Sequence, residues 1–201
     1  MTAVGLSVAT PRPIVAVTGG IGAGKSRFCA ILGETYGIRV YDCDRAAKRI
    51  MAEDEGVKAA LCDITGGEAY KGGILQKRVL AAYILASESN KAAVDGIVHP
   101  AVAADFMSSG LSWLESAILF GSGFHKRVPV DFTICVSAPV WERARRIMER
   151  DGLTHAKAMQ WIAMQQPQGE VEALADAVVY NTGGCDLGKR AKEIMGLIGK
   201  L

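Results

Sequence analysis

Apolar residues in the N-terminal part of the chain alternate between unbroken runs and helical spacing. Residues 14–18, "IVAVT", form a β-branched run followed by glycines, which is typical of a strand buried on both faces of a parallel sheet. Apolar side chains then recur at helical spacing at Phe28, Ile31 and Leu32. "IRVYDCD" predicts a second strand and "RAAKRIMAEDEG" a second helix. This order of elements predicts right-handed βαβ units and an α/β fold.

The middle of the chain has a different pattern. Between residues 57 and 107 the apolar spacing is helical, with no convincing strand. The helical pattern is broken by "TGGEAYKGG" and by the dipeptide His99–Pro100. We interpret this region as a helical insertion into the α/β core.

Strand character returns in residues 111–120 and 131–139. Residues 140–166 then predict a pair of helices on either side of Asp151 and Gly152. A short strand at "AVVYN" and an amphipathic helix in "DLGKRAKEIMGLIGKL" complete the chain.

The glycine-rich stretch "GGIGAGKS" fits the phosphate-binding pattern G-x-x-x-x-G-K-[ST], known as the P-loop. Glycines have no Cβ and tolerate positive φ, so several backbone N–H groups can converge on one anion. The helix that follows directs its free N–H groups to the same place. Lys25 can reach the β- and γ-phosphates, and the Ser26 hydroxyl can bind Mg²⁺. We predict that the nucleotide is bound by Gly19, Gly20, Ile21, Gly22, Ala23, Gly24, Lys25, Ser26 and Arg27.

Two aspartates follow the second predicted strand. Asp42 and Asp44 are two residues apart, so strand periodicity would direct both to one side, beyond the carboxyl end of the sheet. A carboxylate there can accept a proton from a substrate hydroxyl or help to hold Mg²⁺. Asp44 could also cap the following helix, and the two roles do not exclude each other.

Composition and charge exclude several classes of protein. A net charge of +2 is too small to indicate binding to nucleic acid or to an anionic membrane. The five cysteines are scattered, so we expect them to be reduced and mostly buried, with neither disulfides nor a zinc site. The leader "MTAVGLSVATPRP" lacks the features of a secretion signal, and no apolar run approaches the roughly 18 residues of a membrane span. We therefore expect a cytoplasmic protein.

Six segments, in order, resemble the dephospho-coenzyme A kinase family from about residue 14 to residue 184. They are "VTGGIGAGKS", "VYDCD", "GGILQKRVL", "GIVHPAV", "RRIMERDGLT" and "ALADAVVYNTGG". The resemblance implies transfer of the γ-phosphate of ATP, with Mg²⁺, to the ribose 3′-hydroxyl of dephospho-coenzyme A, the last step of coenzyme A synthesis. It also implies a P-loop NTPase fold, whose three-layer core carries a helical insertion and a short helical lid. We expect a monomer or weak homo-oligomer. We assign residues 1–56, 108–142 and 169–201 to the core, 57–107 to the substrate domain and 143–168 to the lid.

The resemblance also implies roles for individual residues. Asp44 matches the proposed general base, and Lys77 stands where the family usually has arginine. His99 matches the His-Pro signature on the substrate side, although without the resemblance a histidine before proline is more often a structural residue at a helix break. Arg146 and Arg150 lie four residues apart on one helix face, where they could close over the triphosphate. The predicted catalytic residues are Lys25, Asp44, Arg146 and Arg150; the substrate ligands are Asp42, Asp44, Lys77 and His99; and the metal ligand is Ser26.

The sequence departs from the family pattern at some positions, which leaves alternatives open. Arg27 replaces the usual threonine, and Gly121 stands where a glutamate is common, so Glu115 could be the nearer acidic group. Arg143 and Arg145 could belong to a solvated helix face. The chain could act as another small-molecule or nucleotide kinase. It could also be a catalytically silent nucleotide-binding regulator, although the presence of Lys25 and Ser26 beside Asp44 argues against this.

Overall fold

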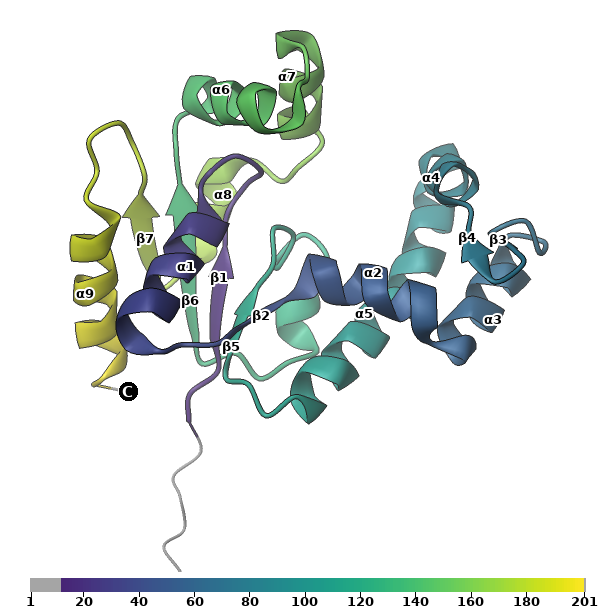
Figure 1. Ribbon diagram of the computed structural model, residues 1–201, viewed down its shortest axis with the longest axis horizontal. Coiled ribbons are helices and arrows are strands. Elements are labelled where there is room, and N and C mark those ends of the chain that lie inside the picture. The colour runs from purple at the N-terminus through teal and green to yellow at the C-terminus, as the bar shows by residue number, and fades with distance from the viewer. Residues whose placement is uncertain (1–11, 201) are drawn as a thin grey trace, which may run out of the picture.

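The computed structural model describes residues 12–200 and contains a five-stranded parallel sheet (Figure 1). The strand order is β2-β5-β1-β6-β7. The strands are β1 (Val15–Thr18), β2 (Val40–Asp42), β5 (Trp113–Glu115), β6 (Phe132–Ser137) and β7 (Ala177–Tyr180). The predicted α/β core with a parallel sheet is therefore confirmed, and the strand that precedes the glycine-rich loop lies at its centre.

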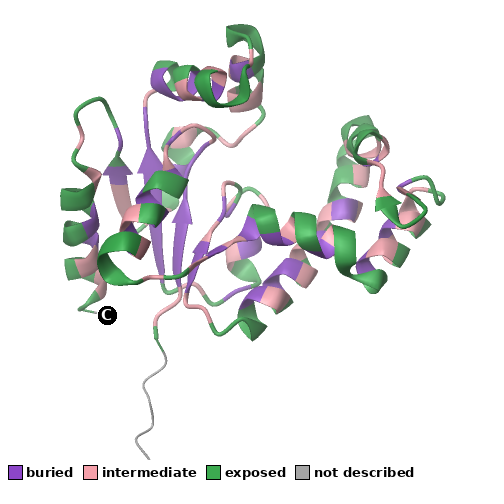
Figure 2. Cartoon of the chain, in the orientation of Figure 1, coloured by how far each residue is buried: buried purple, intermediate pink, exposed green. Residues whose placement is uncertain are grey.

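Helices cover both faces of this sheet, which explains the unbroken apolar runs in the strands. Val15 and Val17 of β1 face α1 (Lys25–Tyr36) and α9 (Leu187–Ile198), while Ala16 faces the opposite cluster. Figure 2 shows the resulting band of buried residues through the central strands. Because both faces are covered, the strands need apolar residues at every position rather than at alternate ones.

The helical insertion projects from one edge of the sheet (Figure 1). It contains α3 (Glu55–Ile64), α4 (Lys77–Ala86) and α5 (Glu88–Ser108), and α2 (Cys43–Glu53), which follows β2, packs against α5. The insertion also contains a hairpin of β3 (Tyr70–Lys71) and β4 (Ile74–Leu75), which the sequence did not predict. Gly72 and Gly73 form its turn with φ of 56° and 78°, the positive φ values that a two-residue hairpin turn favours.

The predicted helix break at His99–Pro100 is wrong, because α5 runs through both residues. Proline removes the N–H that would bond to the carbonyl of Gly96, four residues earlier. Gly96 and Pro100 both lie on the exposed face of the helix, where water can satisfy that carbonyl. The helix therefore continues.

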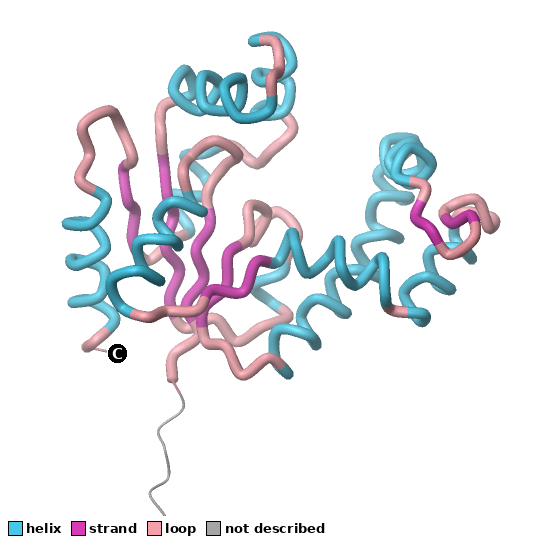
Figure 3. The backbone as a smooth tube through the Cα atoms, viewed as in Figure 1, coloured by secondary structure: helices cyan, strands magenta, loops and turns pink. Residues whose placement is uncertain are grey.

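The segment between β5 and β6 also differs from the prediction. The strand predicted at 111–120 is limited to Trp113–Glu115, and the chain then turns toward the 3₁₀-helix η1 (Phe124–Lys126), as the loops in Figure 3 show. Leu119 and Phe124 are buried in the core cluster below this turn. Their apolar character reflects packing of a loop, which periodicity alone cannot distinguish from a strand.

The predicted helix pair is confirmed as α6 (Val140–Asp151) and α7 (His155–Ala163), with Gly152 ending α6 at a φ of 65°. A further helix, α8 (Gln168–Leu174), leads to β7. Both α6 and α7 lie beyond the carboxyl ends of the strands (Figure 1).

Three of the cysteines, Cys29, Cys43 and Cys135, are buried, and all five are free thiols. Among residues 12–200, no helix is both long and apolar enough to span a membrane. The interpretation of the N-terminal leader concerns residues 1–11, which lie outside the described part of the chain.

Candidate active site

The glycine-rich loop connects β1 to α1 at the carboxyl end of the central strand. Gly19, Gly22 and Gly24 have φ of 131°, 77° and 102°, which other residues rarely adopt. A Cβ on Gly19 would lie 2.0 Å from the carbonyl oxygen of Val136, and one on Gly24 would lie 2.1 Å from Asn181 Nδ2. The loop therefore needs glycine both for its conformation and for its close packing.

Beyond this loop lies a cleft of about 610 Å³. It brings together predicted residues from three parts of the chain, since its lining includes Ile21, Gly22, Gly24, Lys25, Ser26, Arg27, Asp44, Arg146 and Arg150. Glu115, Ala117, Glu149 and Gln165 complete the lining. Asp42, Lys77 and His99 are not part of it.

Lys25 begins α1 and is 8 % exposed. Its Nζ donates a hydrogen bond of 3.4 Å to the carbonyl oxygen of Gly20, within the same loop. Burial lowers the pKa of Lys25, whereas the charges of Glu115 and Asp44 raise it. The weakly bonded ammonium group can exchange this carbonyl for phosphate oxygens.

Ser26 and Glu115 form a pair of oxygen groups beside Lys25. The Ser26 hydroxyl donates to Glu115 Oε1 at 3.1 Å, and Glu115 is the last residue of β5, the strand next to β1. Burial raises the pKa of Glu115, and the charge of Lys25 opposes that shift. Mg²⁺ in nucleotide sites takes one or two protein oxygen ligands and completes its shell with phosphates and water. This donor set fits Mg²⁺.

Asp42 and Asp44 differ in their surroundings. Asp42 ends β2, and its side chain caps α2 by accepting a hydrogen bond of 2.9 Å from the backbone N–H of Arg45. Asp44 lies in the first turn of α2, is exposed and lines the cleft. The expected strand periodicity is wrong because the chain turns from strand to helix between the two residues, and the cap is Asp42 rather than Asp44.

Arg146 and Arg150, which the sequence analysis assigned to a lid, have different partners. Arg146 Nη1 donates to the carbonyl oxygens of Gly22 and Ala23 at 3.2 and 3.1 Å. Its Nη2 donates to Glu142 Oε1 at 2.8 Å and to the carbonyl oxygen of Asn181. Arg146 therefore already joins α6 to the glycine-rich loop. Arg150 is exposed and pairs with the neighbouring Asp151 at 2.7 Å. The guanidinium of Arg150 can therefore move toward a ligand in the cleft more easily than that of Arg146.

The interpretation of Arg143 as part of a solvated face is wrong, since this residue is 3 % exposed. Arg145, in contrast, is solvated and pairs with Glu149 at 2.7 Å. Sequence reasoning also missed Gln165 and Gln168, which accept hydrogen bonds from the loop N–H groups of Ile21 and Gly20 at 2.7 and 3.2 Å. No pattern in "QQPQ" marks them, because their role depends on the tertiary position of the segment that leads into α8 and of its first residue.

Lys77 and His99 lie in the insertion. Lys77 is exposed at the first residue of α4, and its role as a substrate ligand stays a prediction. His99 Nε2 lies 3.5 Å from Asp95 Oδ1 on the same helix, and burial lowers the pKa of His99. His99 lines a small cavity of about 60 Å³ that Asp44 also lines. The structure thus places His99 near the predicted base without giving it direct access to the phosphate cleft.

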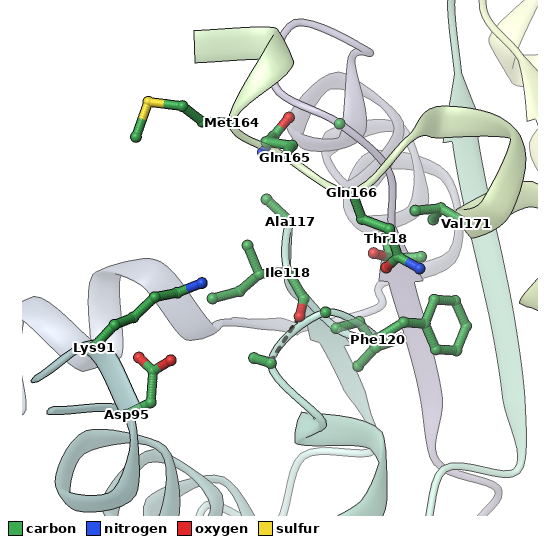
Figure 4. Close-up of a pocket in the computed structure, with 14 residues that line it drawn as sticks. Thr18, Lys91, Asp95, Ala117, Ile118, Phe120, Met164, Gln165, Gln166 and Val171 are labelled. Carbon is green, nitrogen blue, oxygen red and sulfur yellow. Dashed lines mark hydrogen bonds between the residues drawn. The ribbon is translucent and has the colours of Figure 1, made fainter. Parts of the chain in front are cut away.

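A second cavity of about 160 Å³ lies between the glycine-rich loop and α5 (Figure 4). It shares Ala117 and Gln165 with the phosphate cleft, so the two spaces adjoin. Lys91 and Asp95 approach it from α5, opposite Met164. A nucleotide in the cleft and a second substrate in this cavity would lie next to each other.

Comparison with known proteins gives one consistent result. The family model described as dephospho-CoA kinase matches residues 13–186. A dephospho-CoA kinase from Porphyromonas gingivalis is 40% identical over 174 residues, covering 83% of this chain and 85% of the relative. One from Bacteroides fragilis is 36% identical over 176 residues, covering 84% of each chain. The structure is also similar to the crystal structure of a protein from Thermus thermophilus, with a TM-score of 0.79 and 32% sequence identity. The match covers 95% of this chain and 99% of that one.

Proposed function

The chain belongs to the dephospho-CoA kinase family, and we propose that it transfers the γ-phosphate of ATP to the ribose 3′-hydroxyl of dephospho-CoA. The observation that carries this proposal is the gathering of Lys25, Ser26, Glu115 and Asp44 around one cleft beside a second cavity. That arrangement provides groups for the donor phosphates and a carboxylate for the acceptor hydroxyl.

The donor phosphates are held by the glycine-rich loop. The N–H groups at the start of α1 and the positive end of its dipole face the cleft, which favours an anion there. Lys25 Nζ bonds to β- and γ-phosphate oxygens and neutralises charge that builds up during transfer. Because phosphoryl transfer asks for little covalent chemistry from the protein, these contacts supply most of the catalysis.

Ser26 and Glu115 are the residues that would hold Mg²⁺. When bound, the ion screens the phosphate charges and fixes their orientation. Asp44 lies across the cleft, where its carboxylate can orient the 3′-hydroxyl and accept its proton. We propose that residues 57–107 bind the acceptor and that residues 143–168 close over the triphosphate.

Replacement of Glu115 tests the metal assignment. Glu115→Gln keeps the hydrogen bond from Ser26 but removes the negative charge, so the Mg²⁺ concentration for half-maximal rate should rise at least about 10-fold. Titration of the initial rate with Mg²⁺ measures this. The control is Glu149→Gln, which removes a carboxylate from the edge of the same cleft and should leave the Mg²⁺ requirement within twofold. Equal Mg²⁺ requirements in the two variants would contradict the assignment.

The lid arginines should behave differently from each other. Arg150→Ala should lower kcat by about 10- to 100-fold with little change in the Kd of ATP, because its guanidinium meets the phosphates only when the lid closes. Arg146→Ala should lower kcat and also weaken ATP binding, because it removes bonds to the loop carbonyls of Gly22 and Ala23. Steady-state kinetics and calorimetric titration with ATP separate these effects. A loss of ATP affinity in Arg150→Ala with kcat intact would assign it to ground-state binding.

A coupled assay of ATP consumption tests the proposed function. The purified protein is offered dephospho-CoA, AMP, CMP and adenosine as alternative acceptors. We expect dephospho-CoA to give by far the highest kcat/KM. Preference for another acceptor would indicate a different small-molecule or nucleotide kinase, and ATP binding without any turnover would indicate a nucleotide-binding regulator.

A further inference from the structure

Arg143 is a buried cation whose hydrogen-bond partners are all neutral. Its Nε donates to the carbonyl oxygen of Ile21 at 2.8 Å, and its Nη1 and Nη2 donate to the side-chain oxygens of Gln168 and Gln165 at 3.3 and 3.1 Å. Within residues 12–200 it forms no ion pair with a carboxylate, whereas Arg145, Arg146 and Arg150 each form one.

A buried charge without an opposite charge is costly, so its presence needs an explanation. Burial lowers the pKa of Arg143, but a guanidinium keeps its proton in proteins. The protein therefore holds a fixed positive charge that the described residues leave uncompensated. This charge would stabilise an anion that binds nearby, and the site would not have to reorganise to do so.

The position of Arg143 identifies where such an anion would lie. A Cβ on Gly20 would be only 2.1 Å from Arg143 Nη2, so the guanidinium packs directly against the glycine-rich loop. Ile21, whose carbonyl accepts the bond from Arg143 Nε, and Gly22, which packs against the Arg143 backbone, both line the cleft beside the loop. Besides burial, the positive charge of Arg143 lowers the pKa of Lys25.

The two glutamines that bond to Arg143 also bond directly to the glycine-rich loop. Gln165 and Gln168 bond to the N–H groups of Ile21 and Gly20 as well as to Arg143. These bonds hold the first half of the loop and would persist without the guanidinium. They also leave the N–H groups nearer α1 to face the phosphates. A neutral side chain of similar length should therefore preserve the loop and remove only the charge.

We propose that Arg143 is a positioning residue for the nucleotide, acting from behind the glycine-rich loop as the fixed counter-charge of the bound phosphates. This inference rests on the nucleotide site of the proposed function but not on the identity of the acceptor. It adds a fourth cation to Lys25, Arg146 and Arg150. Unlike Arg150, Arg143 is fixed in position, because its guanidinium bonds to Gln165, Gln168 and the loop.

The test compares Arg143→Met, Arg143→Lys and the control Arg145→Met. Arg145 lies on the same helix but is exposed. The measurements are the Kd of Mg·ATP and of inorganic tripolyphosphate by calorimetry, the Tm without ligand, and the KM of dephospho-CoA. Arg143→Met should weaken both phosphate ligands by about 10- to 100-fold, while its Tm without ligand stays equal to or above that of the wild type. Arg143→Lys should recover at least half of the lost binding free energy, and Arg145→Met should match the wild type.

Two results would overturn the inference. One is a Kd of Mg·ATP in Arg143→Met within twofold of the wild-type value. The other is a marked fall in its Tm without ligand, or failure to fold, because either would make Arg143 a structural support for the loop. If the wild type binds Mg·ATP but does not phosphorylate dephospho-CoA, the proposed function fails, and the Kd comparison still decides the role of Arg143.

Discussion

Lys25→Ala is expected to lower kcat by roughly 10³-fold or more. Lys25 is the cation built into the glycine-rich loop, and its ammonium group is almost completely buried. Nothing else that lines the cleft on the α1 side can replace it, because Arg27 is exposed and turns toward Glu34 at 3.7 Å. The measurement is kcat with saturating ATP and dephospho-CoA.

The substitution should not unfold the protein. Burial of the Lys25 ammonium is unfavourable, as its lowered pKa indicates, so its removal should leave the Tm without nucleotide nearly unchanged. Lys189→Ala, on the exposed face of α9 away from the cleft, is the matched control and should keep wild-type kcat. Turnover of Lys25→Ala within tenfold of the control would contradict the role of the loop in transfer.

Asp44→Asn is expected to lower kcat by roughly 10²- to 10⁴-fold while leaving the Kd of ATP unchanged. Asparagine keeps the size of the side chain and its place in the first turn of α2, but it cannot accept the proton of the acceptor hydroxyl. ATP binding is unaffected because the loop and Lys25 are untouched. Single-turnover kinetics with ATP bound beforehand separate the chemical step from binding.

Asp42→Asn is the control for this experiment. Asparagine caps helices about as well as aspartate, so the bond to the backbone N–H of Arg45 should persist and the protein should stay folded. Its kcat should fall by less than about tenfold. A larger loss in Asp42→Asn than in Asp44→Asn would move the role of base to Asp42, and small equal losses would make both aspartates structural.

The sequence predicted the glycine-rich loop and its flanking elements well because such a turn is a local feature. A glycine-rich turn between a buried strand and a helix depends on neighbouring residues, and the structure confirms both flanking elements. The helix pair in the lid is similarly local, since Gly152 ends α6 in the left-handed conformation that favours glycine.

Positions whose role depends on distant segments were harder to predict. Arg143 has the same helical spacing as a solvated arginine, and only the packing of α6 against the loop and Gln165 buries it. Pro100 suggested a helix break because sequence gives no sign that the carbonyl it leaves unpaired faces water. Strand periodicity does not apply to Asp42 and Asp44, because the boundary between β2 and α2 falls between them.

Identification of the phosphorylated product tests the proposed transfer most directly. The protein is incubated with Mg²⁺, dephospho-CoA and ATP labelled in the γ-phosphate, and the labelled product is isolated and located by phosphorus NMR. We predict one label per ATP consumed, on the ribose 3′-oxygen, with coenzyme A as the product. Label released as inorganic phosphate, or attached to any other position or acceptor, would contradict this function.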